Sequence, residues 1–162
     1  MRKQTKLVAV LSTAALLAIG ASMTSFAATG WAEEDGTWVY YNRDGERATD
    51  QWKKSGNNWY WLDSDGEMAI DQLIEDGDNY YYVDINGVMA ANQWVAIDNE
   101  DAGQDDEPDH YWYYFQANGK ALKNGDNSKV ALKTVNGKKY AFDDEGKMLF
   151  GWVAADNAER ID

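Results

Sequence analysis

A unit of 21 residues repeats three times between Gly30 and Gln93, and this repeat constrains the fold more than any other feature of the chain. The spacing from Trp31 to Trp52, Leu73 and Trp94 is 21 residues at every step. Each copy also carries a run of aromatic and apolar residues, followed by a turn rich in Asp and Asn that ends in Gly. A fixed period of this length indicates a repeat architecture, in which each unit buries its apolar face against its neighbours.

Each copy has the pattern of a β-hairpin. In the second copy Trp59 and Trp61 alternate with Tyr60 and Leu62, which is the period of a strand. The turn that follows each run, for example Asp63–Gly66, supplies the positive φ that a hairpin loop needs. A further short strand and a second glycine turn complete the copy. We therefore predict an all-β fold, a solenoid of stacked β-hairpins built on repeats of about 20 residues and stabilised mostly by contacts between neighbours.

The chain begins with a different kind of segment. A basic start is followed by the apolar run Leu7–Ala21 and by the small residues around Ala27. This combination predicts a cleaved secretory signal peptide over residues 1–27, and therefore a secreted protein of the cell wall or cell surface. Residues 28–97 hold the regular repeats one to three and the start of the fourth. The chain has no cysteine, so packing between repeats has to replace disulfides.

The pattern loosens in the second half. Trp94 and Trp112 are 18 residues apart, whereas Trp31 and Trp38 are 7 apart. The extra residues form an acidic insertion over 98–110, which we interpret as a solvated loop. Calcium binding by this loop is left open, because carboxylates suit a hard cation but the spacing is not that of a helix-loop-helix calcium site. Residues 111–162 form divergent repeats four to six, the last incomplete.

Charge and composition exclude several functions. Without the signal peptide the chain has 12 basic and 28 acidic residues, a net charge of −16. Such a surface repels nucleic acid and anionic membranes. Paired carboxylates fall in exposed turns, and the single histidine, His110, adjoins the acidic insertion. The chain has no cysteine nucleophile, metal cluster or phosphate-binding loop, so we expect neither an enzyme nor a cofactor.

The recurring aromatic residues are either the core between repeats or a set of binding pockets. Tyr60, Tyr81 and Tyr113 lie on the face that we assign to the core. On the other face, a Trp that ends one hairpin, the Trp seven residues further on and an aromatic residue of the next hairpin would surround a small cavity. Such rings attract a quaternary ammonium ion by ~0.5–2 kcal/mol per contact. Several weak sites on one chain would bind a polymer with useful avidity.

The residues that carry this pattern resemble a known family. Gly30-Trp31, the run from Gly36 to Tyr41 and the segment Trp59–Met68 are similar to the putative cell-wall-binding repeats, also called choline-binding repeats, of Gram-positive surface proteins. Repeats four to six look more like the related repeats of clostridial toxins and glucan-binding proteins. The resemblance implies a hairpin solenoid that attaches non-covalently to choline on teichoic acid, or to a polymeric sugar.

Carried over by position, the resemblance implies two ligand pockets. The first consists of Trp31 and Trp38 with Trp61 of the next copy. The second consists of Trp52 and Trp59 with Tyr82. Met68 and Met89 match the methionine of the family and would line the pocket walls. A shift of the third ring by one position, to Tyr60 and Tyr81, is left open. In repeat four the third wall would be Ala141, so we expect a structural role for repeats four to six.

The interpretation that follows is a non-catalytic module that attaches an exported protein to the cell wall. Its expected partner is choline or phosphocholine on teichoic acid, or a glucan-type wall polysaccharide. The alternatives are a carbohydrate-binding repeat domain, the attachment part of a larger wall hydrolase or toxin-like protein, and a structural spacer. Homodimerisation is left open, and membrane insertion is not expected.

Overall fold

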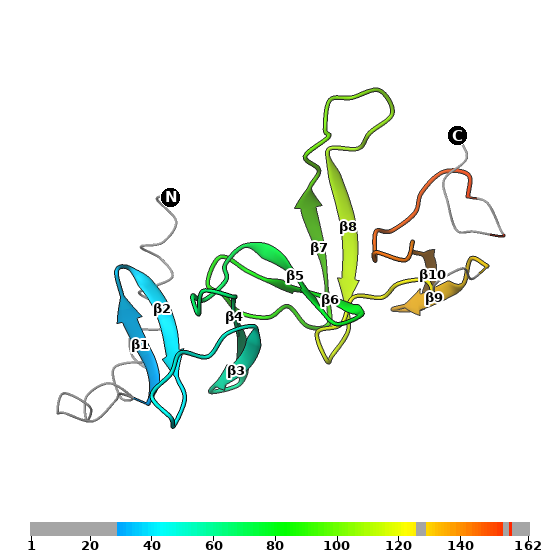
Figure 1. Cartoon of the computed structure of the whole chain (residues 1–162). Coiled ribbons are helices and arrows are strands. Elements are labelled where there is room, and N and C mark those ends of the chain that lie inside the picture. Colours follow the sequence, from blue (N-terminus) through cyan, green and yellow to red (C-terminus); the bar gives the residue numbers. More distant parts are fainter. Residues whose placement is uncertain (1–28, 126–128, 154–155, 157–162) are drawn as a thin grey trace. The chain divides into compact units, whose positions relative to one another are not determined.

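The computed structural model describes residues 29–125, 129–153 and 156, so the expected signal peptide lies outside the described residues. Within these ranges the chain forms ten strands and no helix, and every sheet consists of two consecutive strands (Figure 1). Consequently none of the described residues belongs to a helix that could cross a membrane. The strands are β1 Gly30–Glu34, β2 Thr37–Tyr41, β3 Gln51–Ser55, β4 Asn58–Leu62, β5 Gln72–Asp76, β6 Asn79–Val83, β7 Gln93–Asp98, β8 His110–Phe115, β9 Leu132–Val135 and β10 Lys138–Ala141.

The predicted hairpins are confirmed, and their loops are short. In the first hairpin Glu34 pairs with Thr37, which leaves Asp35 and Gly36 as a two-residue loop. Their φ values of 51° and 78° are both positive, as a type I′ turn requires. Asn136 and Gly137 form the equivalent loop between β9 and β10, with φ values of 49° and 80°. The hairpin loop is therefore the second glycine turn of the sequence pattern.

The turns rich in Asp and Asn have a different role from the one we predicted. They follow the second strand of a hairpin and end in a single bridge, such as Leu62 to Met68, before the chain enters the next hairpin. In one of them the Asp63 carboxylate accepts hydrogen bonds from the N–H groups of Asp65 and Glu67, both at 2.9 Å. Side-chain bonds of this kind stabilise a tight turn without a strand partner. These turns thus connect hairpins.

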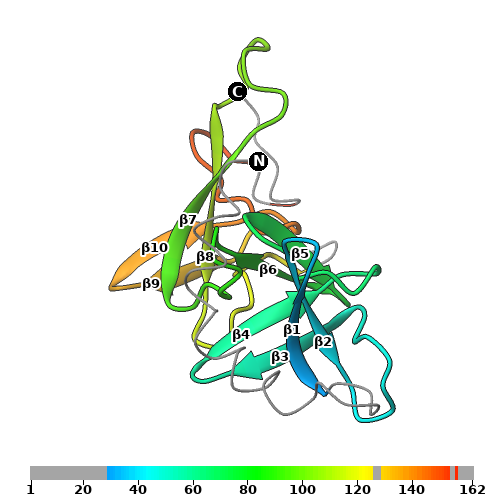
Figure 2. The same ribbon diagram turned by 90° about the vertical axis from the view of Figure 1, so that its left-hand side faces the viewer.

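The chain divides into two compact units. Among the described residues, unit 1 comprises those up to Ile74 together with Tyr82–Ala90, and unit 2 comprises Glu75–Tyr81 together with those from Ala91 onward. In unit 1 the strands of β3–β4 run across the direction of β1–β2, and in unit 2 those of β9–β10 run across β7–β8 (Figure 2). The largest fully buried side chains are Trp38, Val39, Leu62 and Val83 in unit 1 and Phe115 and Phe142 in unit 2.

One backbone hydrogen bond recurs between successive copies and positions their side chains. In unit 1 the Met68 N–H donates to the Trp38 carbonyl at 2.8 Å, and in unit 2 the Met148 N–H donates to the Trp112 carbonyl at the same distance. In each case the methionine follows a connecting turn, and its N–H bonds to a Trp in the hairpin of the preceding repeat. This contact brings the candidate site residues together.

Candidate functional site

Strand pairing decides which rings share a face. In the first hairpin Trp31 pairs with Tyr40, and their rings meet edge-on with centroids 5.3 Å apart. Trp38 lies two residues from Tyr40 on the same strand, so it points to the same face. In the second hairpin Tyr60 and Leu62 share the face that packs against this one.

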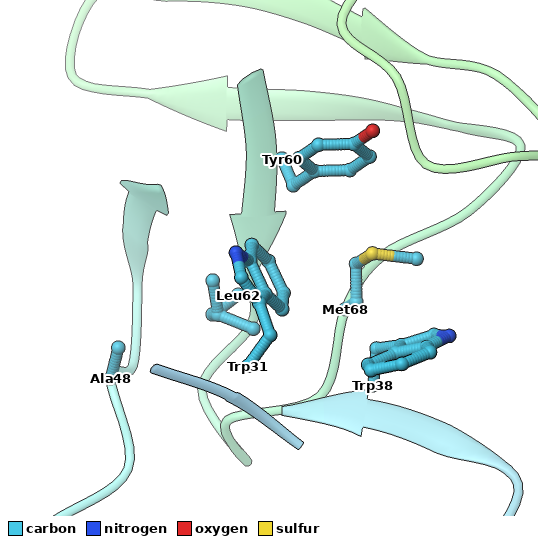
Figure 3. Packing of buried hydrophobic residues seen from close by; sticks show 6 residues of the cluster. All are labelled: Trp31, Trp38, Ala48, Tyr60, Leu62 and Met68. Atoms are coloured by element: carbon cyan, nitrogen blue, oxygen red, sulfur yellow. The ribbon is translucent and has the colours of Figure 1, made fainter. Parts of the chain in front are cut away.

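Three of these residues and Met68 form what we call the closed cluster, which consists of Trp31, Trp38, Tyr60 and Met68. The rings of Trp31 and Tyr60 lie 5.4 Å apart at 76°, and Figure 3 shows the Met68 side chain between the rings of Tyr60 and Trp38. Ala48 and Leu62 complete the group. Trp38 is only 1% exposed, and its indole N–H and that of Trp31 are buried with no hydrogen-bond partner in the described structure. The closed cluster is therefore packed core in this conformation.

Trp61 does not belong to the closed cluster, which corrects the expected grouping of Trp31 and Trp38 with Trp61. Successive side chains of a strand point to opposite faces, so Trp61 lies on the other side of β4 from Tyr60. There its ring meets that of Trp52, its cross-strand partner, at 5.2 Å. The third ring of the first group is thus Tyr60, the one-position shift that the sequence left open.

The residues expected to form the second pocket all lie in unit 1. Trp59 is 40% exposed, and the Lys54 ammonium lies 5.9 Å from the centre of its ring. The Met89 N–H donates to the Trp59 carbonyl at 2.9 Å, which repeats the contact of Met68 with Trp38. The Tyr82 hydroxyl donates to the Asp71 carboxylate at 2.6 Å. Trp59 and Met89 are therefore neighbours, while Trp52 packs on Trp61.

Unit 2 contains a cavity of about 300 Å³ lined by Trp94, Trp112, Tyr140 and Met148, which we call the open pocket. The rings of Trp94 and Tyr140 lie 4.8 Å apart at 64°, and Trp94 also contacts Tyr114 and Phe142. Trp112 is 46% exposed, so the cavity is accessible from solvent. Three rings and a methionine side chain line this wide, open depression, and no charged residue lines it.

The open pocket has the same composition as the closed cluster, position for position. Trp94 and Trp112 occupy the positions in their repeat that Trp31 and Trp38 occupy in the first repeat. Tyr140 precedes Met148 by eight residues, as Tyr60 precedes Met68. The expected third wall, Ala141, is replaced by Tyr140, again one position earlier, because Tyr140 is on the inner face of β10. Sequence reasoning missed this pocket, although the shared spacing between tyrosine and methionine was a signal for it.

Several ionisable groups of unit 2 lie outside the lining of the open pocket. Burial raises the pKa of Tyr113 to about 12, and it also raises the pKa of the Asp143 carboxyl, which accepts N–H bonds from Glu145 and Lys147. The Lys147 ammonium lies 4.6 Å from the centre of the Tyr111 ring and 2.9 Å from the Glu145 carboxylate. Each of these groups has a structural partner, and none of them lines the cavity.

The acidic insertion forms a loop between β7 and β8 with its own hydrogen bonds. Asn99 is buried, and its side-chain amide donates to the Glu107 carboxylate and the Pro108 carbonyl. His110 lies 3.1 Å from Asp98, and both side chains are exposed. Among the described residues, no group of three or more His, Cys, Asp or Glu side chains is placed to hold a metal ion.

Comparison with known proteins identifies related sequences and structures. The sequence model of the choline-binding repeat matches residues 28–69 and 48–94, and that of the putative cell wall binding repeat matches residues 111–121. The choline-binding domain of Spr1274 from Streptococcus pneumoniae is 31% identical; the match covers 62% of this chain and 98% of that domain, with a TM-score of 0.44. The chain belongs to the choline-binding repeat family.

Two longer proteins of Streptococcus pneumoniae are also similar to this chain. Choline binding protein F is 30% identical over 76% of this chain and 34% of its own length, with a TM-score of 0.50. CbpJ is 28% identical over 78% of this chain and 37% of its own length, with a TM-score of 0.51. The chain thus spans about a third of each of these proteins. No curated protein matches it significantly.

Proposed function

We propose that this chain is a non-catalytic module that attaches an exported protein to choline-bearing teichoic acid or a related wall polymer. The open pocket carries this proposal. It combines three aromatic rings and a methionine side chain around a solvent-accessible cavity, in a chain of the choline-binding repeat family.

The lining of the open pocket suits a quaternary ammonium ion. The negative π faces of Trp94, Trp112 and Tyr140 attract a cation, and each favourable contact contributes ~0.5–2 kcal/mol. A trimethylammonium group has no N–H to donate, so it needs no acceptor in the pocket. Met148 supplies polarisable apolar surface against the methyl groups. Two or three such contacts give a weak, roughly millimolar site.

The other aromatic groups have different roles in this proposal. Trp31, Trp38, Tyr60 and Met68 hold the hairpins of unit 1 together, because they are buried. Trp59 and Met89 are a second candidate binding site for choline. The Trp59 side chain is exposed, and the Met89 N–H donates a hydrogen bond to the Trp59 carbonyl. A polymer that carries many choline groups would gain avidity from a second weak contact on the same chain.

A choline titration followed by tryptophan fluorescence tests the proposal. We expect a saturable, roughly millimolar response in the wild type, and a response to tetramethylammonium but not to 3,3-dimethylbutanol, the neutral analogue of choline. Trp112→Ala should lose most of the affinity. Trp152→Ala, at a residue that is 77% exposed and outside the pocket, is the matched control and should bind as the wild type does. Equal affinities of the two variants would refute the assignment of the pocket.

A further inference from the structure

Unit 1 contains a second cavity, of different chemistry. It measures about 410 Å³ and is lined by Thr29, Gly30, Tyr40, Tyr41, Asn42, Arg43 and Lys53. Two of these residues are cationic and none is acidic, although the chain as a whole has 28 acidic and 15 basic residues. We call it the basic pocket. Its lining is therefore positively charged, whereas the chain as a whole is negatively charged.

The two cations reach the basic pocket from different segments. Lys53 lies on β3 opposite Tyr60, and its ammonium is 4.8 Å from the centre of the Tyr40 ring. Arg43 is exposed in the turn after β2. The Tyr41 hydroxyl donates to Glu34, which also pairs with Arg47. The hydrogen bond from Tyr41 lowers the pKa of Glu34, and Arg47 lowers it further, so this neighbouring carboxylate already has its own cation.

This set of side chains suits an oxyanion with several acceptors. A guanidinium group donates in a planar fork that matches phosphate oxygens, and a lysine ammonium adds a mobile point charge. The Asn42 amide adds further donor capacity beside them. Tyr40 is a wall of the basic pocket and also contacts Trp31 of the closed cluster, so the pocket is built on the core of unit 1.

We propose that the basic pocket binds phosphate groups of the same polymer whose choline enters the open pocket. This inference rests on the proposed function, because choline is carried on such polymers through a phosphate ester. A polymer that offers the ammonium group therefore also offers phosphate. A chain with a net charge of −13 repels a polyanion, so contact requires a local site where cations outnumber acids. The basic pocket is such a site.

The test uses glycerol 3-phosphate, a phosphate ester without choline, measured by NMR titration on the full chain. Arg43→Gln with Lys53→Gln should weaken its binding by about tenfold or more, because charge-assisted hydrogen bonds are lost. Lys138→Gln with Lys139→Gln removes the same charge from two exposed residues of β10 and should bind as the wild type does. Arg43→Gln alone, in an exposed turn, should show part of the loss with an unchanged unfolding midpoint.

The outcomes separate this inference from the proposed function. Loss of phosphate binding in the Arg43/Lys53 variant, with choline affinity unchanged, supports both the phosphate site and the proposed choline-binding function. Equal phosphate binding in the two double variants overturns the basic pocket and leaves the choline site intact. Acetate that competes as well as glycerol 3-phosphate also overturns it, since the pocket would then be a general anion site. Phosphate binding without any choline response refutes the proposed function while the basic pocket stands.

Discussion

The closed cluster of unit 1 and the open pocket of unit 2 are each built from two Trp, one Tyr and one Met at the same positions of the repeat. In both, two Trp residues of one hairpin meet a Tyr and a Met of the next, and the methionine N–H bonds to the second Trp carbonyl at 2.8 Å. They differ in access to solvent: Trp38 is 1% exposed and Trp112 is 46% exposed. One residue pattern thus serves as core in one unit and surrounds a cavity in the other.

This difference shows that composition alone does not identify a binding site in a repeat protein. A fully buried aromatic group stabilises the fold, because its apolar surface is removed from water. The same burial makes its ring faces inaccessible to a ligand. A partly exposed group retains free ring faces, which are the feature that a cation needs. The two groups therefore predict opposite responses to the same substitution.

The largest expected effect is on stability. Trp38→Ala should lower the free energy of unfolding by about 3–5 kcal/mol, the usual cost of removing a buried Trp. Trp112→Ala should cost less than half as much, because nearly half of that side chain is already exposed. Chemical denaturation followed by far-ultraviolet circular dichroism measures both. Trp38→Phe, which keeps a ring, should fall between Trp38→Ala and the wild type. Equal losses for Trp38→Ala and Trp112→Ala would erase the distinction between core and pocket.

The next effect concerns the alkaline stability of unit 2. The Tyr113 phenol ionises near pH 10 when unfolded and at about 12 when folded, because it is buried. The pKa is raised by folding, so this contribution to stability is fully present below pH 10 and is lost as the pH rises to 12. The rise of the Tyr113 pKa from 10 to about 12 corresponds to roughly 2–3 kcal/mol of unfolding free energy.

Tyr113→Phe provides the control for this pH dependence. The variant has no phenol at this position, so its unfolding free energy should fall less between pH 9 and pH 12 than that of the wild type. Denaturant titrations at several pH values measure the difference between the two proteins. Parallel pH curves would show that burial of Tyr113 is not what makes unit 2 sensitive to alkali.

Much of the fold was predictable because its signals are local. The period of 21, the alternation of Trp59 to Leu62 and the Asp-Gly and Asn-Gly loops give strands and hairpins directly. The roles of the two turns in each copy were assigned wrongly, since both contain glycine with positive φ and only strand pairing tells them apart.

The composition of the aromatic groups was less predictable. The first two rings follow from spacing within one hairpin, but the third depends on which face of the next hairpin turns inward. That is a property of packing between hairpins, and a shift of one residue exchanges the faces. The same shift, from Trp61 to Tyr60 and from Ala141 to Tyr140, accounts for both errors.

A smaller effect should distinguish the two units by how much choline slows the hydrogen exchange of their amides. Choline at ten times its dissociation constant stabilises the form that binds it by about 1.4 kcal/mol. Exchange of the Met148 amide, which bonds to Trp112, should therefore slow by about tenfold, the factor for this free energy. The equivalent Met68 amide, bonded to Trp38, is the internal control and should exchange at an unchanged rate. Equal protection of both amides would place choline in both groups.

The smallest expected effect distinguishes a cation from a sugar as the ligand of the open pocket. Tyr140→Phe keeps the ring face and removes only the hydroxyl, so choline affinity should change by about twofold or less, since the π face supplies the attraction. Tyr140→Leu removes the face and should lose clearly more. A polysaccharide that uses the hydroxyl as a hydrogen-bond partner would reverse this order, because losing such a bond costs about 0.5–1.5 kcal/mol whether or not the ring remains. Fluorescence titration of both variants with choline and with a soluble glucan decides between the two ligands, and a large loss in Tyr140→Phe would favour the sugar.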